Sequence, residues 1–285
     1  MSQKVRWLWI GVVVLFILNI AVFFSLIPKP GKVLRVVYLN IGQGDAIYIE
    51  APNGKQMLID GGRDKKVISE LSSVMSFFDR SIDVLMASHP DADHIAGLVD
   101  TLGRYRVGMV VEPGSDTDTQ VYKKLEETIS QKNIAHVAAR TGQEIVLDEK
   151  NNIKVTILFP DQNVSSWETN ASSIVARLTY GDNSFLFTGD SPIEIEDYLV
   201  AHQGGLLKSD VLKLGHHGSR TSTGDFYLSA VAPALAIISA GAGNSYGHPH
   251  QEVLDRLANH HIDYLSTIDN GRIEVVSDGK SLTVK

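Results

Sequence analysis

The sequence predicts an α/β fold, built as a four-layer αββα sandwich and preceded by one transmembrane helix. Three observations support this prediction: an apolar run opens the chain, a strand-rich stretch occurs twice, and each stretch is followed by alternating helix-like and strand-like segments. Two such halves can pack their sheets face to face and cover them with helices. With 285 residues, 44% of them hydrophobic, the chain is long enough for this core.

The first element is an apolar segment with the length of a membrane span. Residues 7–27 are apolar except for Gly11, Asn19 and Ser25, and at about 1.5 Å per residue they cross a bilayer core of roughly 30 Å. The run continues into Pro-Lys-Pro without a small-residue cleavage site, so we interpret it as an uncleaved anchor rather than a signal peptide. Basic residues on its two sides nearly balance. Because a short tail before a single span favours a cytoplasmic N-terminus, we expect a single-pass protein of the cell membrane with an extracytoplasmic domain.

Proline and glycine after the anchor cannot continue a helix, so we divide the chain into residues 1–31, the tail, anchor and linker, and residues 32–285, the folded domain. Apolar residues at strand or helix spacing, bounded by turn residues, predict its elements. The expected strands are 34–39, 46–50, 56–59, 82–88, 107–111, 153–159, 174–180, 184–188, 211–214, 234–239, 263–266, 272–276 and 281–284. The expected helices are 67–78, 94–102, 121–132, 226–231 and 251–260.

Charge and cysteine content limit the chemistry. A net charge of -7 argues against a broadly basic nucleic-acid surface, but a metal site can attract phosphate locally, so a nucleic-acid substrate is not excluded. The chain contains no cysteine, which excludes disulfides, thiolate metal sites and a thiol nucleophile. Any metal must therefore be held by His, Asp, Glu or Asn.

The strongest chemical signal follows the strand expected at 82–88. It reads His-Pro-Asp-Ala-Asp-His and offers His89, Asp91, Asp93 and His94. Four such side chains cannot share one face of a helix or strand, whereas a loop at a strand end can bring them together. A divalent cation would offset the repulsion between the two carboxylates, and these donors suit zinc, manganese or iron. The alternative is a solvated acidic loop that contains two histidines.

Further polar residues lie beyond the ends of other expected strands. They are Asp60, Asp190, His216, His217 and His248, most of them beside glycine. Loops at strand ends can converge at one edge of a sandwich, so we expect these residues near the first loop. The alternatives are a turn aspartate for Asp60 and ordinary loop histidines for the others.

Five motifs in this order resemble the metallo-β-lactamase-fold hydrolases, and within them the hydrolase domain of the ComEC family of competence DNA-uptake proteins. The resemblance runs from about residue 33 to the C-terminus. The motifs are Leu-Asn-Ile-Gly-Gln-Gly-Asp-Ala (39–46), Leu-Ile-Asp-Gly-Gly (58–62), Ser-His-Pro-Asp-Ala-Asp-His (88–94), Leu-Phe-Thr-Gly-Asp (186–190) and Lys-Leu-Gly-His-His-Gly-Ser (213–219).

The resemblance implies a ligand set for two divalent metal ions. His89 and Asp91 would hold the first ion, Asp93 and His94 the second, and Asp190 would bridge them. Asp91 stands where the superfamily's usual His-x-His-x-Asp-His loop has its second histidine, as is typical of the ComEC-like branch.

A further histidine of the first site is missing from the position that the resemblance implies. Asn170 occupies that region, 20 residues before Asp190, and an amide is a poor zinc ligand. We therefore expect zinc or manganese, with weaker binding at the first site.

The remaining candidates have roles that the sequence leaves open. One of His216 and His217 would complete the second site, while the other contacts substrate phosphate or protonates the leaving group; with Asp93 and Asp190 these are the catalytic candidates. Asp60 is expected to orient a ligand imidazole. Asp45, His248 and Ser219 are expected near the substrate or the ligands, with a simple turn as the alternative for Asp45.

The expected reaction is hydrolysis by a metal-activated water. The ComEC-like motifs favour a phosphodiesterase or nuclease acting on DNA. One alternative is an envelope phosphoesterase for small or lipid-linked phosphodiesters, and another is a non-catalytic module that binds DNA or a protein partner. Expected partners are the membrane, through the N-terminal helix, and DNA uptake machinery, with the oligomeric state open. Since the sequence predicts a single span and no channel, we expect no direct role as a translocation pore.

Overall fold

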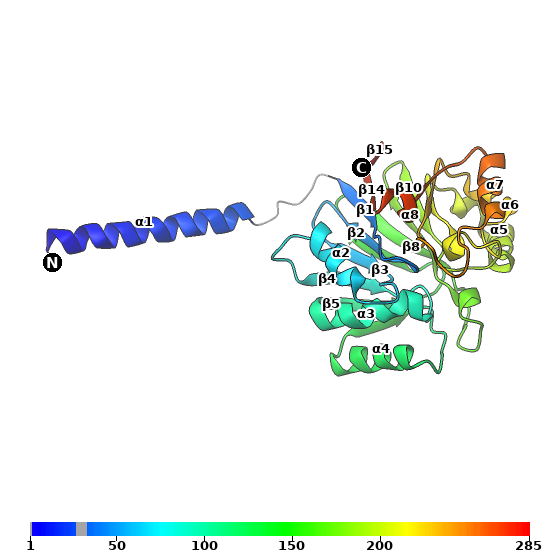
Figure 1. Cartoon of the computed structure of the whole chain (residues 1–285), viewed down its shortest axis with the longest axis horizontal. Helices are drawn as coiled ribbons and strands as arrows, with labels where there is room; N and C mark the ends of the chain where they lie inside the picture. The colour runs from blue at the N-terminus through cyan, green and yellow to red at the C-terminus, as the bar shows by residue number, and fades with distance from the viewer. Residues whose placement is uncertain (1, 27–32) are drawn as a thin grey trace.

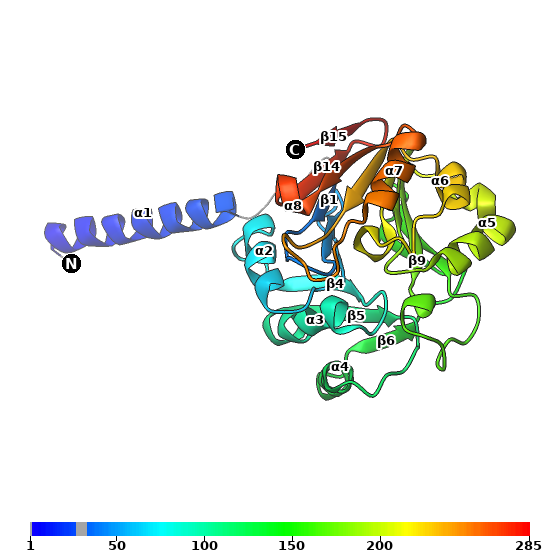
Figure 2. The ribbon, with the colours of Figure 1, turned by 45° about the vertical axis from the view of Figure 1, so that its right-hand side comes forward.

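A computed structural model describes residues 2–26 and 33–285 of the chain. Two sheets lie face to face and helices cover their outer faces (Figures 1 and 2). This arrangement confirms the predicted αββα sandwich. The anchor expected at 7–27 corresponds to α1 (Gln3–Leu26), while residue 27 and the expected boundary between residues 31 and 32 lie outside the described residues.

The first sheet has eight strands in the order β15-β14-β1-β2-β3-β4-β5-β6. Neighbours from β15 to β3 are antiparallel and those from β3 to β6 are parallel. Its strands are β1 (Leu34–Tyr38), β2 (Ile47–Glu50), β3 (Gln56–Ile59), β4 (Ser81–Met86), β5 (Arg106–Glu112), β6 (Ala135–Ala138), β14 (Ile273–Ser277) and β15 (Leu282–Val284). The last two strands thus return to the first sheet, where β14 covers the edge that β1 would otherwise expose.

The second sheet has seven strands in the order β13-β12-β11-β10-β9-β8-β7, and β10 to β13 are parallel. Its strands are β7 (Glu144–Asp148), β8 (Ile153–Phe159), β9 (Val175–Tyr180), β10 (Asn183–Phe187), β11 (Val211–Lys213), β12 (Leu235–Ile238) and β13 (Asp263–Ser266).

Helices cover the outer faces of both sheets. Those packed on the first sheet are α2 (Lys66–Val74), α3 (Ala92–Arg104) and α4 (Gln120–Gln131), and those on the second are α5 (Ile193–Leu207), α6 (Asp225–Val231) and α7 (Gln251–Asn259). Three short elements complete the fold: η1 (Asn170–Ser172), η2 (Gly215–Gly218) and α8 (Thr267–Asn270).

Strand alternation divides the apolar residues among three cores. On β3, Met57 and Ile59 join the core between the sheets, while Leu58 joins the core beneath α2 and α3. On β10, Phe185 joins the core between the sheets and Leu186 the core beneath α5. Because both faces of each sheet are covered, the central strands carry apolar residues on both faces, which is typical of parallel sheets.

The exposed N-terminal helix has the composition of a membrane span. All of its described side chains from residue 2 to residue 20 are exposed, and residues 3–20 are long and apolar enough to cross a bilayer. Within residues 2–26 and 33–285 it is the one helix with that property. Its composition, together with 0% burial of this segment, fits membrane association.

Candidate metal centre

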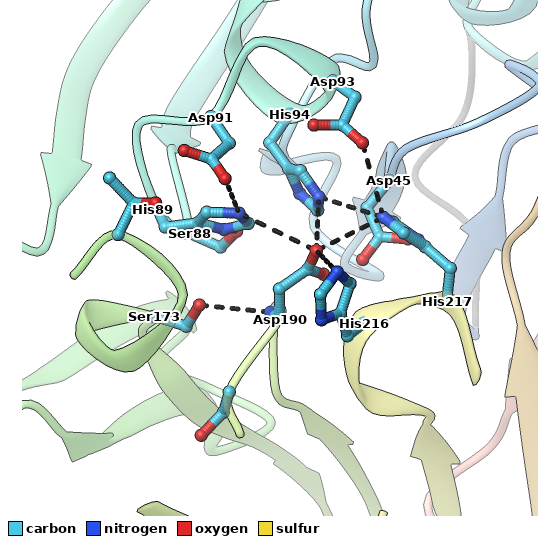
Figure 3. A network of polar contacts seen from close by, with 12 residues as sticks. Asp45, Ser88, His89, Asp91, Asp93, His94, Ser173, Asp190, His216 and His217 are labelled. Atoms are coloured by element: carbon cyan, nitrogen blue, oxygen red, sulfur yellow. Dashed lines mark hydrogen bonds and ion pairs between the residues drawn. The ribbon is translucent and has the colours of Figure 1, made fainter. Parts of the chain in front are cut away.

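The candidate site lies where loops from both sheets meet at one edge of the sandwich. Asp60 follows β3, His89 follows β4, Asp190 follows β10 and His216 follows β11. Figure 3 shows the side chains of the last three, with their neighbours, directed toward a common centre. The structure therefore brings together loops that are separated by more than 100 residues in the sequence.

The His-Pro-Asp-Ala-Asp-His segment is divided between a loop and a helix. His89 lies in the loop, and Asp91 precedes α3 with an extended backbone and makes no capping hydrogen bond through its side chain. Asp93 and His94 belong to the first turn of α3, which begins two residues before its predicted start at 94. The candidate ligands converge because the chain changes from loop to helix within the motif.

Asp190 is the centre of the cluster. Its Oδ2 atom lies 3.4 Å from Nε2 of His94, 3.4 Å from Nε2 of His217, 3.6 Å from Nε2 of His216 and 3.9 Å from Nε2 of His89 (Figure 3). Its backbone N–H donates to Oγ of Ser173. One carboxylate oxygen is thus surrounded by four imidazole nitrogens, which is the arrangement expected of a shared ligand.

Hydrogen bonds on the far side of two rings fix which nitrogen faces the centre. His94 Nδ1 lies 2.9 Å from Asp60 Oδ2, and His217 Nδ1 lies 3.0 Å from the carbonyl oxygen of Ser239. Both partners are acceptors, so both Nδ1 atoms carry a proton and both Nε2 atoms are directed toward the centre. These Nε2 atoms are 3.2 Å apart, so a proton or a metal cation is required between them.

Buried atoms without hydrogen bonds show that the residues fit a metal cation. His89 Nε2, Asp190 Oδ1 and Asp45 Oδ1 are buried and have no hydrogen-bond partner. Native proteins rarely leave such atoms unsatisfied, and a bound ion can satisfy them in place of a hydrogen bond. Asp45, His94, Asp190 and His217 each direct a ligand atom into a region where these atoms lie within 4.8 Å of one another. The donor set of imidazoles and carboxylates suits a divalent ion.

Burial and neighbouring charges shift the pKa values of His89, His94 and Asp190 in different directions. Burial and the neighbouring His94 lower the pKa of His89 to about 4, which keeps it in the neutral form that binds metals. Burial opposes charge on His94, but Asp190 and Asp60 outweigh it and raise its pKa well above the usual value. Burial likewise opposes ionisation of Asp190, yet His217 and His94 hold its pKa well below the usual range. The centre therefore contains buried charged groups, which require opposite charges nearby.

Asp60 is hydrogen-bonded beside two of the imidazoles, and its role in orienting metal ligands stays a prediction. Its carboxylate accepts from the backbone N–H of Ser88 at 2.7 Å and from the Ser88 hydroxyl at 2.6 Å, in addition to its contact with His94. The same hydroxyl lies 3.0 Å from Nδ1 of His89. One buried carboxylate thus contacts His94 directly and His89 through Ser88.

A buried ion pair lies behind His217. Lys213 Nζ is 2.6 Å from Asp45 Oδ2, and the side chains are 1% and 2% exposed. Asp45 Oδ1 is 3.5 Å from Nδ1 of His217. Sequence reasoning included Lys213 in a motif but gave it no role; its available signal was a charged residue inside the apolar strand β11.

His216, His217 and His248 lie close together on the side of the cluster formed by the second sheet. His216 and His217 have left-handed backbones, with φ of 47° and 57°, and the His217 side chain is 1% exposed whereas that of His216 is 27% exposed. The ring of His248 lies 5.4 Å from that of His216, and its Nδ1 is buried without a hydrogen bond. Ser219 reaches this group through Thr221, whose hydroxyl is 3.0 Å from Ser219 Oγ and 3.3 Å from His216 Nδ1.

The other predicted ligands lie at the margin or have no direct contact. Asp91 Oδ2 is 3.8 Å from His89 Nε2, and Asp93 Oδ2 is 3.8 Å from His217 Nε2. Asn170 begins η1 and its Oδ1 is buried without a partner. The backbone oxygen of Asn170 accepts from the N–H of Ser173, whose hydroxyl accepts from the backbone N–H of Asp190. Among the described residues no hydrogen bond or ion pair joins the Asn170 side chain to this cluster, so its place among the ligands stays a prediction.

Comparison with known proteins places these features in a family. The model of the metallo-beta-lactamase superfamily matches residues 39–242. The ComE operon protein 3 of Bacillus subtilis (strain 168) is 31% identical over 257 residues, covering 84% of this chain and 32% of the relative. Competence protein ComA of Neisseria gonorrhoeae is 30% identical over 261 residues, covering 90% and 35%. The chain thus spans about a third of the length of these relatives.

The solved structure of the metallo-beta-lactamase fold protein YhfI from Bacillus subtilis has the same architecture. It superposes with a TM-score of 0.54 at 12% sequence identity, covering 84% of this chain and 98% of that one. This likeness agrees with the two-sheet arrangement described above.

Proposed function

Because this chain belongs to the metallo-beta-lactamase superfamily, we propose that it is a metal-dependent hydrolase of phosphodiesters, with DNA as its substrate. The observation that carries the proposal is the convergence of four imidazole Nε2 atoms on the buried carboxylate of Asp190. No thiol is present to serve as a nucleophile, and a metal-activated water requires none.

The proposed cofactors are two divalent ions, zinc or manganese. His89 and Asp91 would hold the first ion, with Asn170 as a weak additional ligand, and Asp190 would bridge. Asp93, His94 and His217 would hold the second; His217 is favoured over His216 because its Nε2 is only 3.2 Å from that of His94. We expect tighter binding at the second site, where imidazoles come from both sheets. When bound, such ions lower the pKa of water and neutralise charge on the attacked phosphate.

Two further side chains, those of His216 and Asp60, would take part in the reaction. His216 is partly exposed, with Nδ1 near Thr221 and Nε2 toward Asp190. It is therefore the group that would donate a proton to the departing oxygen. Asp60 keeps the ligand imidazoles in their metal-binding orientation.

The choice of DNA rests on two lines of support. A relative that matches most of this chain is named a competence protein, and the two-carboxylate loop with Asp91 and Asp93 resembles that of the ComEC-like hydrolases. This relative also supports DNA uptake machinery as a partner.

Hydrolysis is tested with the full chain in detergent, supplied with manganese or zinc and either single-stranded DNA or a chromogenic phosphodiester. Asp93→Ala should abolish cleavage, because its carboxylate is a proposed ligand. His260→Ala is the control, since this histidine contacts Asp225 on α6 rather than the site. The proposal fails if the two variants are equally active, or if no phosphodiester is cleaved with either metal.

We also propose that α1 anchors the protein in the cell membrane with the domain outside the cytoplasm. The length and apolar composition of α1 support the anchor, and the orientation is what the following experiment tests. Protease added to intact cells should digest the domain. Full protection of the domain would reverse the topology.

A further inference from the structure

The first sheet has an entry end and a site end. Strands β1, β3 and β4 run in the same direction, because β1 and β3 are each antiparallel to β2, and β4 is parallel to β3. The chain enters the domain at the start of β1. The loops that carry Asp45, Asp60 and His89 follow the ends of β1, β3 and β4. The start of the domain and the metal centre therefore lie at opposite ends of the sheet.

An exposed aromatic pair lies at the entry end. Phe77 and Phe78 precede β4, and their side chains are 76% and 60% exposed. Their rings meet edge to face at 5.1 Å, and the guanidinium of Arg80 lies 6.0 Å from the centre of the Phe77 ring. Throughout residues 33–285 this is the one pair of adjacent large apolar side chains that are both exposed. Exposure of two neighbouring aromatic rings to water is unfavourable, and neither ring belongs to the hydrophobic core of the first sheet.

A hydrogen bond connects the start of β1 to the end of α2, just before this pair. Arg35, the second residue of β1, donates from Nη1 to the carbonyl oxygen of Val74 at the end of α2. Phe77 follows three residues later. In both ribbon views, α2 and the first sheet lie on the side of the body where the chain enters, whereas α5 and α6 lie on the far side (Figures 1 and 2).

We propose that Phe77, Phe78 and Arg80 form a bilayer-contact surface that docks the domain on the membrane spanned by α1. Seven residues separate Leu26 from Leu34, and a fully extended segment of that length covers at most roughly 25 Å. The entry end is thus held close to the lipid surface. Phenylalanine side chains bury readily at the boundary between headgroups and acyl chains, and the guanidinium of Arg80 can pair with lipid phosphates.

This docking directs the metal centre away from the bilayer. The six residues of β4 separate the aromatic pair from the His89 loop, a distance of roughly 20 Å at about 3.3 Å per residue. The substrate then reaches the site from the aqueous side. The docking rests on the proposed membrane anchor but not on the proposed hydrolysis. Taken together with the hydrolysis, the orientation favours a soluble phosphodiester such as DNA over a lipid-linked one.

Because the chain contains no native cysteine, one introduced cysteine can be labelled specifically. The full chain carrying Phe77→Cys is labelled with the fluorophore NBD and reconstituted in vesicles of three parts phosphatidylcholine to one part phosphatidylglycerol, with or without a doxyl-quencher lipid. The matched control is Phe226→Cys, because Phe226 is 73% exposed but lies on α6. We expect a blue shift and loss of most of the fluorescence for the label at 77, and neither for the label at 226.

Equal quenching at the two positions, or none at position 77, would overturn the docking surface. The docking surface would also be overturned if the fluorescence of the label at 77 were the same in vesicles as in detergent. Repeating the measurement in an Asp190→Ala background keeps the readout separate from catalysis. Quenching at 77 should persist there, and it reports lipid contact whether or not the protein proves to be a hydrolase.

Discussion

Asp60 contacts His94, a proposed metal ligand, on the side of the ring away from the cluster. It accepts from Ser88 and faces His94 Nδ1, so it holds the His94 proton on the side away from the centre. Replacing Asp60→Asn removes the negative charge and sets an amide N–H₂ group against these donors. We expect metal affinity to fall by about 10- to 100-fold, as for other residues that orient ligand imidazoles.

Competition with a metal-binding dye measures that affinity, and Asp182→Asn, an exposed turn residue, serves as the control. Unchanged affinity in a folded Asp60→Asn protein would mean that His94 needs no such support.

Residue types in the sequence identified the cluster better than they identified its supports. Histidine and aspartate beyond strand ends were named because their chemistry suits a metal. Lys213 and the carbonyl of Ser239 were not, because their importance arises only when β11 and β12 pack beside the β1 loop. A backbone carbonyl has no signature in a sequence.

At the scale of elements, Gly44 sets how closely the β1 loop approaches α3. It has a φ of +106°, and a Cβ added there would lie 1.9 Å from the carbonyl oxygen of Asp93. Gly42 also has a positive φ, +85°, but nothing lies within 4 Å of its added Cβ. We expect Gly42→Ala to lower the free energy of unfolding by about 1–2 kcal/mol, the cost of a left-handed backbone.

Gly44→Ala should cost more than Gly42→Ala and should also weaken metal binding, because the first turn of α3, which carries Asp93 and His94, must move. Urea unfolding and metal titration of both variants measure the two effects. Similar losses of stability, with metal affinity intact in both, would show that the close approach is unimportant.

The Lys213–Asp45 pair connects the two sheets, since Asp45 follows β1 and Lys213 ends β11. Lys213→Met leaves a buried carboxylate unpaired, which should lower the free energy of unfolding by about 3–5 kcal/mol. Lys154→Met breaks a contact of the same length, 2.6 Å, with Glu144, but this pair is partly exposed, so its loss should cost at most about 1 kcal/mol. Equal costs in urea unfolding would contradict the role of burial.

The Lys213–Asp45 pair also determines the direction in which stability changes with pH. Burial opposes ionisation of Asp45, but Lys213 and His217 outweigh it and lower its pKa. The stabilisation is therefore fully present above the unfolded pKa of about 4 and is lost as pH falls further. The difference between the parent protein and Lys213→Met should shrink in acid. A difference that grows there would reverse this assignment.

Element prediction from the sequence succeeded where periodicity was strong. The strands that flank the site were expected within a few residues of their observed bounds, whereas α5, β6 and β7 were not expected. The segment that forms α5 begins Ile-Glu-Ile-Glu, a strand period, and contains Gly204 and Gly205, so its helix depends on packing against β8 and α6. The return of β14 to the first sheet is likewise a long-range pairing with no local signal.

At the scale of the whole molecule, the site joins loops of the two sheets. Asp60, His89 and His94 come from loops of the first sheet, while Asp190 and His217 come from loops of the second. Without a cation, the lone pairs of His94 and His217 and the carboxylates of this region face one another in a buried space. Separating the sheets would relieve that repulsion, so metal binding and folding should be coupled.

Removing the metal is therefore expected to lower the stability of the entire domain. A ligand that binds only the folded state stabilises it by about 4 kcal/mol at roughly 1,000 times its Kd, which for a domain of this size corresponds to a Tm change of roughly 10 °C. Thermal unfolding of the full chain in detergent, with EDTA and then with excess manganese or zinc, measures this change. Asp190→Ala, which lacks the shared ligand, should unfold at the same temperature with and without metal. If EDTA and added metal leave the Tm of the parent protein unchanged, the cluster does not hold an ion, and its facing imidazoles must share a proton instead.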